Sequence, residues 1–461
     1  MPEILGLRTD LFTWLAFAAL LACWVGSVRL VPGWKTEGWT AVVRSVYGIA
    51  WLGFSVDIVV RFLMLSYNAV EWANGTSRLL ALPVETVTRS VMYCGMYWAL
   101  VAAGYAAARR RRTAGALAVT RVLTVEMAYA AVVPVAAVCS ALFYVVDMPD
   151  EVPLALVTPL GVLATLYMVP AAIVWWDHFR RGAAWRVGSM QMVALLPAVV
   201  NAWRSPYREN IAPVFLIPLL AAVFAGRRPR LARLIPVAVA CFLVLTAVVS
   251  SYRAIKWENT RPEEVATEIK RAGVVEWLTG DFGERMARFH SFDSMLLTVH
   301  LVPQARGYSG RNVLVSPFVR AFVPRMIDSG KAAADAGEQF GVRTWAYDDP
   351  QTRDHGGAAI APSMPGDLYD AGGPIYIALG ALIWGALLGV VDGWKGHLPA
   401  WSAAAVTALV ATHCAMSIER DFDHEVAGMI QIFLVLVVVC GGMMLGRGRR
   451  VEWGAAVGTE Y

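Results

Sequence analysis

Long apolar stretches alternate with short polar ones along most of this 461-residue chain. A run of roughly 17–25 apolar residues is long enough to cross a bilayer as an α-helix. By that criterion the chain contains about eleven transmembrane helices, at about 11–31, 41–66, 80–108, 122–146, 152–176, 185–203, 208–226, 231–250, 373–393, 398–417 and 426–446. The pattern therefore predicts an all-α fold, a polytopic transmembrane helix bundle.

One long polar segment interrupts this pattern. Residues 251–372 carry mixed charge and include PEEVATEIKRAGVVEWL, whose apolar residues recur at helical spacing. Loops of this length are usually functional or disordered. We expect four regions: helices one to eight over 1–250, a large catalytic loop with short helices over 251–372, helices nine to eleven over 373–446, and a tail over 447–461.

Basic residues predict which ends of the helices face the cytoplasm. Blocks of arginine follow the third, fifth, seventh and last predicted helices, and all fall on one side of an eleven-helix count. They are Arg109 to Arg112; Arg180 and Arg181; Arg227, Arg228, Arg230 and Arg233; and Arg447, Arg449 and Arg450. Two of the alternate loops, DMPDEVP and ERDFDHE, are acidic. Because cytoplasmic loops are enriched in Lys and Arg, this predicts an external N-terminus, a cytoplasmic C-terminus and an external long loop.

Composition supports lipid as the solvent for much of the chain. Hydrophobic residues make up 57% and charged residues 16%, with a mean hydropathy of +0.53. Soluble proteins carry about a quarter charged residues. The net charge of +5 resides largely in short blocks between apolar runs, so it does not indicate a nucleic-acid partner. The six cysteines all lie inside apolar runs without metal-ligand spacing, which favours small core residues.

Arginines also occur where the topology predicts the outer side. The short loop WRSPYRENIAP carries Arg204 and Arg208, and the long loop carries many more. Arginine donates two parallel hydrogen bonds to phosphate and keeps its charge. For any single arginine, contact with lipid headgroups explains the charge about as well. For the set across two loops, we favour an anionic ligand.

Two charged pairs lie within predicted helices at i,i+4 spacing, which places both members on one helix face. They are Asp57 with Arg61, and Glu85 with Arg89. Charges inside membranes usually face a cavity or a partner. Self-neutralised pairs that aid packing are the favoured interpretation, and contact with a ligand in an outer vestibule is the alternative.

Several enzyme classes lack their signatures here. The chain has no Walker P-loop, HExxH or GxSxG motif, and its loop histidines have no zinc-site spacing. Nucleotide hydrolysis and a metal or other cofactor are therefore not indicated. A substrate that arrives already activated fits better.

Three sequence elements carry a resemblance to a known family. They are RSPYREN in the short loop, AFVPRMID in the long loop, and MPGDLYDAGGPIYIALGALIWG leading into the ninth predicted helix. Together with the helix layout they resemble the Wzy-type O-antigen and repeat-unit polysaccharide polymerases of bacterial membranes, which are related to the O-antigen ligases. Two positions depart from the family pattern: Lys331 alone remains of a Trp-Pro-x-Lys-Pro run, and Asp367 stands where Glu is common.

The resemblance implies a metal-independent glycosyltransferase of the bacterial inner membrane. Its substrates would be polyprenyl-diphosphate-linked oligosaccharides, joined into a surface polysaccharide with release of polyprenyl diphosphate. Membrane lipid would surround it, and a chain-length regulator protein is a further partner of such enzymes.

The resemblance and the loop charges together suggest site residues. Asp367 would orient or deprotonate the acceptor hydroxyl. His355 and His290 compete for the base role, with a structural role as the favoured alternative for each. The candidate diphosphate-binding residues are Arg204, Arg208, Arg288, Arg320 and Arg325. Pro324 would fix the backbone before Arg325.

Three other functions remain open. An O-antigen ligase shares this chemistry and differs in its acceptor. A flippase for lipid-linked oligosaccharide predicts charges along a route across the membrane and interrupted helices in two halves, but the sequence has no two-half symmetry. A loop that only binds a partner would leave the arginines of both loops without a shared role.

Overall fold

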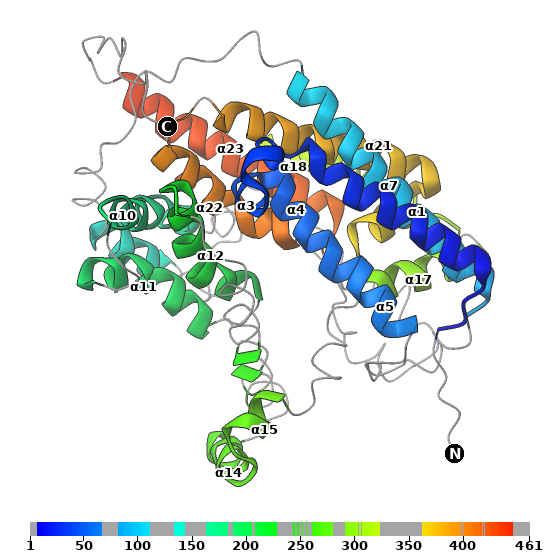
Figure 1. Cartoon of the computed structure of the whole chain (residues 1–461), viewed down its shortest axis with the longest axis horizontal. Helices are drawn as coiled ribbons and strands as arrows, with labels where there is room; N and C mark the ends of the chain where they lie inside the picture. The colour runs from blue at the N-terminus through cyan, green and yellow to red at the C-terminus, as the bar shows by residue number, and fades with distance from the viewer. Residues whose placement is uncertain are drawn as a thin grey trace.

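The structure is a computed structural model of the whole chain (Figure 1). It describes residues 7–66, 82–110, 133–142, 163–182, 188–204, 208–227, 243–244, 247–248, 251, 255, 261–279, 291–302, 304–305, 307–322, 362–396, 398, 400–416, 418 and 420–445. The helices are α1 Leu11–Ser27, η1 Val28–Leu30, α2 Trp34–Glu37, α3 Trp39–Arg44, α4 Val46–Phe54, η2 Ser55–Val60, α5 Arg61–Ser66, α7 Val84–Arg110, α10 Met168–Arg180, α11 Ser189–Arg204, α12 Arg208–Phe224, α14 Pro262–Ala272, α15 Val274–Thr279, α17 Ser291–Leu301, α18 Ser316–Phe322, α21 Met364–Lys395, α22 Ala400–Met416 and α23 Phe422–Leu445.

The all-helical prediction is confirmed, since no strand occurs among the described residues. Four helical stretches are long and apolar enough to cross a membrane: Leu11–Leu30, Val46–Ser66, Val84–Arg110 and Met364–Lys395. Shorter apolar helices accompany them at Val133–Leu142, Ser189–Ala202, Ile211–Phe224 and Ala400–Ala415. The chain is therefore a membrane protein, while the count of eleven spans and the external loop stay predictions. Much of the predicted spans 122–146, 152–176 and 231–250 lies outside the described residues.

Apolar side chains cover the outside of the long helices. Phe12 on α1 is 71% exposed, Ile375 on α21 is 70% exposed, and Met92 on α7 is also exposed. Water-soluble proteins rarely expose contiguous apolar surface of this kind. In a bilayer these side chains contact lipid tails, so their exposure agrees with the membrane assignment.

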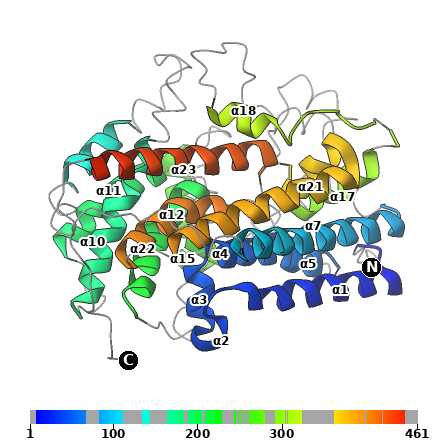
Figure 2. The same cartoon turned by 90° about the horizontal axis from the view of Figure 1, so that it is seen from above.

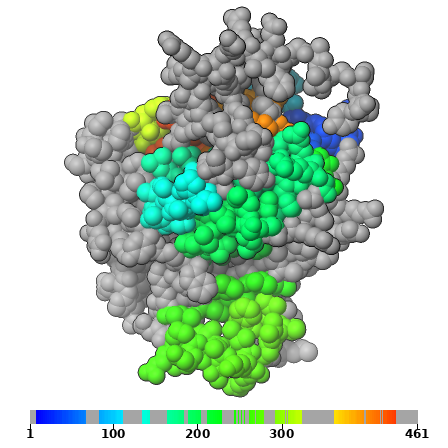
Figure 3. Space-filling model, turned by 90° about the vertical axis from the view of Figure 1, so that its left-hand side faces the viewer, coloured from blue at the N-terminus to red at the C-terminus, as the bar shows by residue number. Residues whose placement is uncertain are grey.

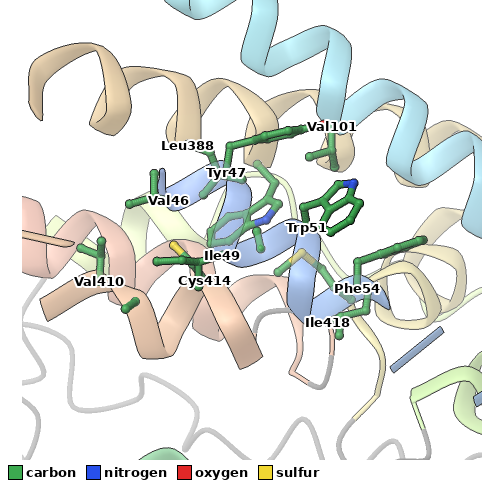
Figure 4. Packing of buried hydrophobic residues seen from close by; sticks show 14 of the residues in the cluster. Val46, Tyr47, Ile49, Trp51, Phe54, Val101, Leu388, Val410, Cys414 and Ile418 are labelled. Carbon is green, nitrogen blue, oxygen red and sulfur yellow. The ribbon is translucent and has the colours of Figure 1, made fainter. Parts of the chain in front are cut away.

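Helix α4 lies at the centre of the bundle, and its side chains are therefore buried on all sides. Figure 4 shows Tyr47 and Phe54 beside α7 and α21, with Val410 and Cys414 of α22 on the other side of α4. The Tyr47 ring stacks on Tyr105 with centroids 4.3 Å apart, and Phe54 lies 4.7 Å from Trp98. An apolar helix without a polar face is typical of such a central position.

The helices alternate in direction. Thr13 contacts Thr88 at 2.7 Å at one end of α1 and α7, and Arg109 donates to the Leu30 carbonyl at the other, so the two helices are parallel. Helix α21 runs with α7, since Gly385 lies against Val101 and Gly389 against Tyr105. Helices α4 and α5 run the opposite way, and α22 runs with α4 (Figure 4). These relative directions match the predicted alternation. Which end faces the cytoplasm stays a prediction.

One end of the bundle is held together by arginines that cap other helices. Arg44 donates to the Val223 carbonyl at 2.7 Å, Arg227 to Phe179 at 3.1 Å, and Arg109 to Leu30 at 3.0 Å. The last carbonyls of a helix lack partners within it. Val223 and Phe179 also accept the Gly226 and Gly182 amides, so at these two carbonyls the arginine adds a second hydrogen bond. Basic residues of two predicted cytoplasmic blocks thus serve as helix caps at a single end, which we call the basic end.

Asp392 joins α21 to the start of α4 at the same end. Its carboxylate accepts hydrogen bonds from the Val46 amide at 3.0 Å and the Tyr105 hydroxyl at 3.0 Å, and from the Ser45 hydroxyl. Lys395 lies 2.8 Å from it. A buried carboxylate needs partners of this number, so Asp392 has a structural role.

Helix α21 is interrupted at the point where the sequence predicts that the ninth helix begins. Gly372 and Gly373 have non-helical backbone angles, and Gly373 has φ +72°, in the region that favours glycine. Before this break, residues 364–371 form a separate buried helical segment. The predicted helix at 373–393 is therefore preceded by eight helical residues that the hydropathy pattern assigned to the loop.

Residues 364–371 fold back into the bundle, and we call them the fold-back segment. Leu368 packs against Gly380, which follows the break. The Tyr369 ring lies 5.2 Å from Tyr93, whereas Met364 lies 2.8 Å from the Tyr97 hydroxyl, one turn further along α7. The segment thus begins deep in the bundle and runs outward to the glycines, where α21 turns back inward.

Helix α17 belongs to the predicted long loop but is packed inside the bundle (Figure 2). Its Asp293 forms a buried two-point ion pair with Arg61, at 3.0 and 2.6 Å, and Phe292 contacts Phe62. Arg61 thus joins α5 to α17. The sequence suggests only a pairing with its i,i+4 neighbour Asp57. The other predicted pair, Glu85 and Arg89, is exposed.

Helices α14 and α15 stand apart from the bundle as a separate lobe (Figure 3). They confirm the helical spacing read in PEEVATEIKRAGVVEWL, with a short break at Gly273, where φ is +86°.

Replacing Gly385 by alanine should weaken the packing of α21 on α7. A methyl group there would lie 2.0 Å from the Val101 carbonyl oxygen, and such crowding costs about 1–3 kcal/mol. Thermal unfolding in detergent should show a lower midpoint for Gly385→Ala. The control is Gly26→Ala on α1, where the space is open, and its midpoint should be equal or higher. Equal midpoints for wild type and Gly385→Ala would contradict the close packing.

Candidate functional site

Asp367 of the fold-back segment is fully buried and held from two sides. One carboxylate oxygen pairs with the Arg311 guanidinium, which also lies 3.6 Å from Asp370. The other oxygen accepts the Phe422 amide at 3.0 Å. A buried carboxylate is tolerated only with such charge and hydrogen-bond compensation. Asp367 thereby links the fold-back segment to the segment before α18 and to the first residue of α23.

The backbone fixes the position of this carboxylate. Ser363 caps the fold-back segment by accepting the Gly366 amide at 3.2 Å, and its carbonyl accepts the Asp367 amide at 2.8 Å. The N-terminal amides of a helix attract negative charge, which favours a carboxylate in this first turn. The capping residue and the following Pro365 thus set where Asp367 enters the bundle.

Helix α18 lies against the start of α23 and brings Arg320 to the same place (Figure 2). The Arg320 guanidinium pairs with Asp423 at 2.8 Å, and Ser316 donates to the other oxygen of Asp423, also at 2.8 Å. The Arg320 side chain keeps 23% exposure. Helix α18 ends at Phe322, two residues before Pro324 and Arg325.

Glu425, one turn into α23, is shared by two cationic partners. Arg420 donates to one of its oxygens at 2.8 Å, and His413 of α22 contacts the other at 2.9 Å. The end of α22 is thereby tied to the beginning of α23, and both helices meet the groups around Asp367.

Together these residues form what we call the charged cluster, which lies within the bundle near the middle of α7, since the fold-back segment that carries Asp367 contacts Tyr93 and Tyr97. Its members are Arg311, Arg320, Asp367, Asp370, His413, Arg420, Asp421, Asp423 and Glu425. Five carboxylates here face three guanidinium groups. Among the described residues, no group of three or more His, Cys, Asp or Glu side chains could hold a metal ion. The chemistry available is proton transfer by carboxylates and stabilisation of negative charge by arginine.

The predicted site residues divide into three groups. Asp367 and Arg320 both belong to the charged cluster. Arg204 is the last residue of α11 and Arg208 the first of α12, so both lie at the end of this hairpin away from Arg227 and the basic end. The remaining predicted residues lie outside the described part of the chain: Arg288, His290, Arg325 and His355.

Most of the partners in the cluster could not be recognised from the sequence pattern. Arg311 was one of many loop arginines with no feature to separate it from the others. The acidic segment ERDFDHE indicated only topology in the sequence, although it supplies Asp421, Asp423 and Glu425. A concentration of acids directly before an apolar helix was the signal available.

Comparison with known proteins adds no relative: no protein-family model matches the chain, and no curated protein or solved structure is significantly similar to it. The interpretation of the site therefore rests on its geometry and on the sequence resemblance described above.

Replacing Arg311 by alanine should destabilise the protein by about 3 kcal/mol, because it leaves Asp367 buried without its cation. The double variant Arg311→Ala/Asp367→Asn should recover part of this loss, since the uncompensated charge is then absent. Denaturant unfolding in detergent micelles measures both. Arg271→Ala, on the exposed face of α14, is the control and should change stability little. Additive effects of the two cluster substitutions would contradict the pairing.

Proposed function

We propose that this membrane protein is a glycosyltransferase that joins polyprenyl-diphosphate-linked oligosaccharides, with the charged cluster as part of its active site. The growing glycan would leave its lipid carrier and pass to the end of a second lipid-linked oligosaccharide. The proposed setting is a bacterial inner membrane, with the charged cluster on the outer side and the basic end in the cytoplasm.

One observation carries the proposal. Two residues from different parts of the chain contact the start of α23: Asp367, from one of the three sequence elements that suggested the family, and Arg320, which directly precedes another. Asp367 of MPGDLYDAGG accepts the Phe422 amide, and the next residue, Asp423, pairs with Arg320, in the helix that leads into AFVPRMID. Their shared location supports a shared function for Asp367 and Arg320.

The charges of the cluster suit the departure of a diphosphate. Arginines that are already fixed in place stabilise negative charge on a leaving group without reorganising during the reaction. Asp423 fixes Arg320, and Asp367 fixes Arg311. Holding two lipid-anchored substrates in one membrane also lowers the entropic barrier to their reaction. The apolar outer faces of α1, α7 and α21 provide the lipid contact that such substrates need.

A flippase for lipid-linked oligosaccharide is the second candidate, favoured by the interruption of α21. Transporters use broken helices near the middle of the membrane to bind substrates. Helix α21 provides one such interruption at Gly372 and Gly373, and the π-helical stretch η2 lies between α4 and α5. The transferase is preferred because Asp367 and Arg320, two of the residues that the family resemblance suggests for the site, both belong to the charged cluster.

Purified protein in proteoliposomes should extend lipid-linked oligosaccharides into ladders of longer glycan. Arg320→Ala should reduce the rate on the order of 100-fold, because it removes one fixed donor for the leaving group. Arg271→Ala is the matched control from the exposed lobe and should retain the wild-type rate. Gel separation of the released glycans measures the extension.

Two results would count against the transferase. Failure of the wild type to form ladders, together with movement of the lipid-linked oligosaccharide across the bilayer of the same vesicles, would favour the flippase. Ladders of equal intensity from wild type and Arg320→Ala would remove the charged cluster from the active site.

A further inference from the structure

Asp421 occupies a distinct position within the charged cluster. It lies between α22 and α23, directly before Phe422, whose amide is bound by Asp367. Its Oδ2 atom is buried and has no hydrogen-bond partner among the described residues. A buried carboxylate oxygen without a partner is costly, so its retention points to a role other than stability.

The neighbouring carboxylates do not share this property. Asp367 receives Arg311 on one oxygen and the Phe422 amide on the other. Both oxygens of Asp423 are also bound, one by Ser316 and the other by Arg320. Those of Glu425 are bound by Arg420 and His413. A carboxylate whose two oxygens are both bound by donors has no free oxygen to accept a hydrogen bond from a substrate hydroxyl.

We propose that Asp421 is the general base of the candidate site, and that Asp367 is a positioning residue that holds the start of α23. This assignment rests on the proposed transferase function. The acceptor hydroxyl would lose its proton to Oδ2 of Asp421 as its oxygen bonds to the anomeric carbon of the donor. The bond from that carbon to the diphosphate oxygen would break, and its electron pair would leave with the polyprenyl diphosphate. Asp421 would then release the proton to water.

The electrostatic surroundings of Asp421 suit a proton acceptor. Burial raises the pKa of its carboxyl, and the negative charges of Asp423 and Glu425 raise the pKa further, while Arg320 opposes them, with a result of about 6. A base acts best when its pKa is near the working pH. The titratable and charged groups around it come from the fold-back segment, the segment before α18, α18, α22, the connection between α22 and α23, and α23. They are Asp367, Asp370, Arg311, Arg320, His413, Arg420, Asp423, His424 and Glu425.

The test uses Asp421→Asn in the full-length protein, reconstituted with lipid-linked oligosaccharides. Its kcat should fall at least about 100-fold with little change in KM, because a proton acceptor acts in the transition state. Wild-type kcat/KM should decline as pH falls through about 6, and the residual activity of Asp421→Asn should lack this acidic limb.

Stability provides a second readout that does not depend on transfer. Since the folded-state pKa of Asp421 is raised, its charged form weakens the fold at pH 7.5, and this penalty disappears as pH falls below the unfolded value near 4. Asp421→Asn should therefore unfold at a higher temperature than wild type at pH 7.5 and at the same temperature at pH 4. The matched control Glu425→Gln should unfold at a lower temperature at pH 7.5, because it removes the charge that pairs with Arg420 and His413.

The outcomes separate the two proposals. Transfer by wild type with unchanged kcat and an intact acidic limb in Asp421→Asn would overturn the role of Asp421 and leave the transferase standing. A lower midpoint for Asp421→Asn at pH 7.5 would overturn it too, since it would show a structural role. Absence of transfer by wild type would overturn the proposed function, and the role of Asp421 with it. A lower kcat together with a higher unfolding midpoint at pH 7.5 for Asp421→Asn would support both the transferase and the role of Asp421.

Discussion

The burial of one carboxylate connects the parts of this protein that the sequence keeps apart. Asp367 lies inside an apolar bundle, where an uncompensated charge is prohibitively costly. Arg311 and the Phe422 amide supply the compensation, and each comes from a different segment. The fold-back segment, the segment before α18 and the start of α23 must therefore meet, and α18 brings Arg320 to the same place.

The basic end and the charged cluster use charge differently. At the basic end, arginines bind the terminal carbonyls of other helices, and Asp392 binds the amides and hydroxyls around the start of α4. These contacts provide hydrogen bonds to backbone groups, so a structural role is sufficient to explain them. In the charged cluster, carboxylates outnumber guanidinium groups and one carboxylate oxygen lacks a partner. This imbalance is why the cluster, and not the basic end, is the candidate site.

The interruption of α21 allows the cluster to lie within the bundle. A continuous helix would place Asp367 beyond the end of α7, because Gly385 is already beside Val101. The reversal at Gly372 and Gly373 instead returns the preceding residues alongside Tyr93 and Tyr97. Backbone that reverses at such depth is tolerated only where protein surrounds it, and the fold-back segment is buried throughout. Packing by α17, Arg61 and Asp293 completes that enclosure.

Hydropathy and charge placement, which are local properties, determined the helical class and the membrane setting. They also predicted the relative directions of the described helices and a helix that begins at residue 373, but not the helical residues 364–371 before it. They also determined that Arg109 and Arg227 lie at the same end of the bundle, because each follows an apolar run of known length. The partners of Asp367, Arg320 and Arg61 could not be predicted this way, since they lie 56, 103 and 232 residues away in the chain. Only packing decides which distant helices meet, and a buried charge takes the partner that packing brings to it. The tertiary structure therefore decided the composition of the charged cluster and the distinct position of Asp421.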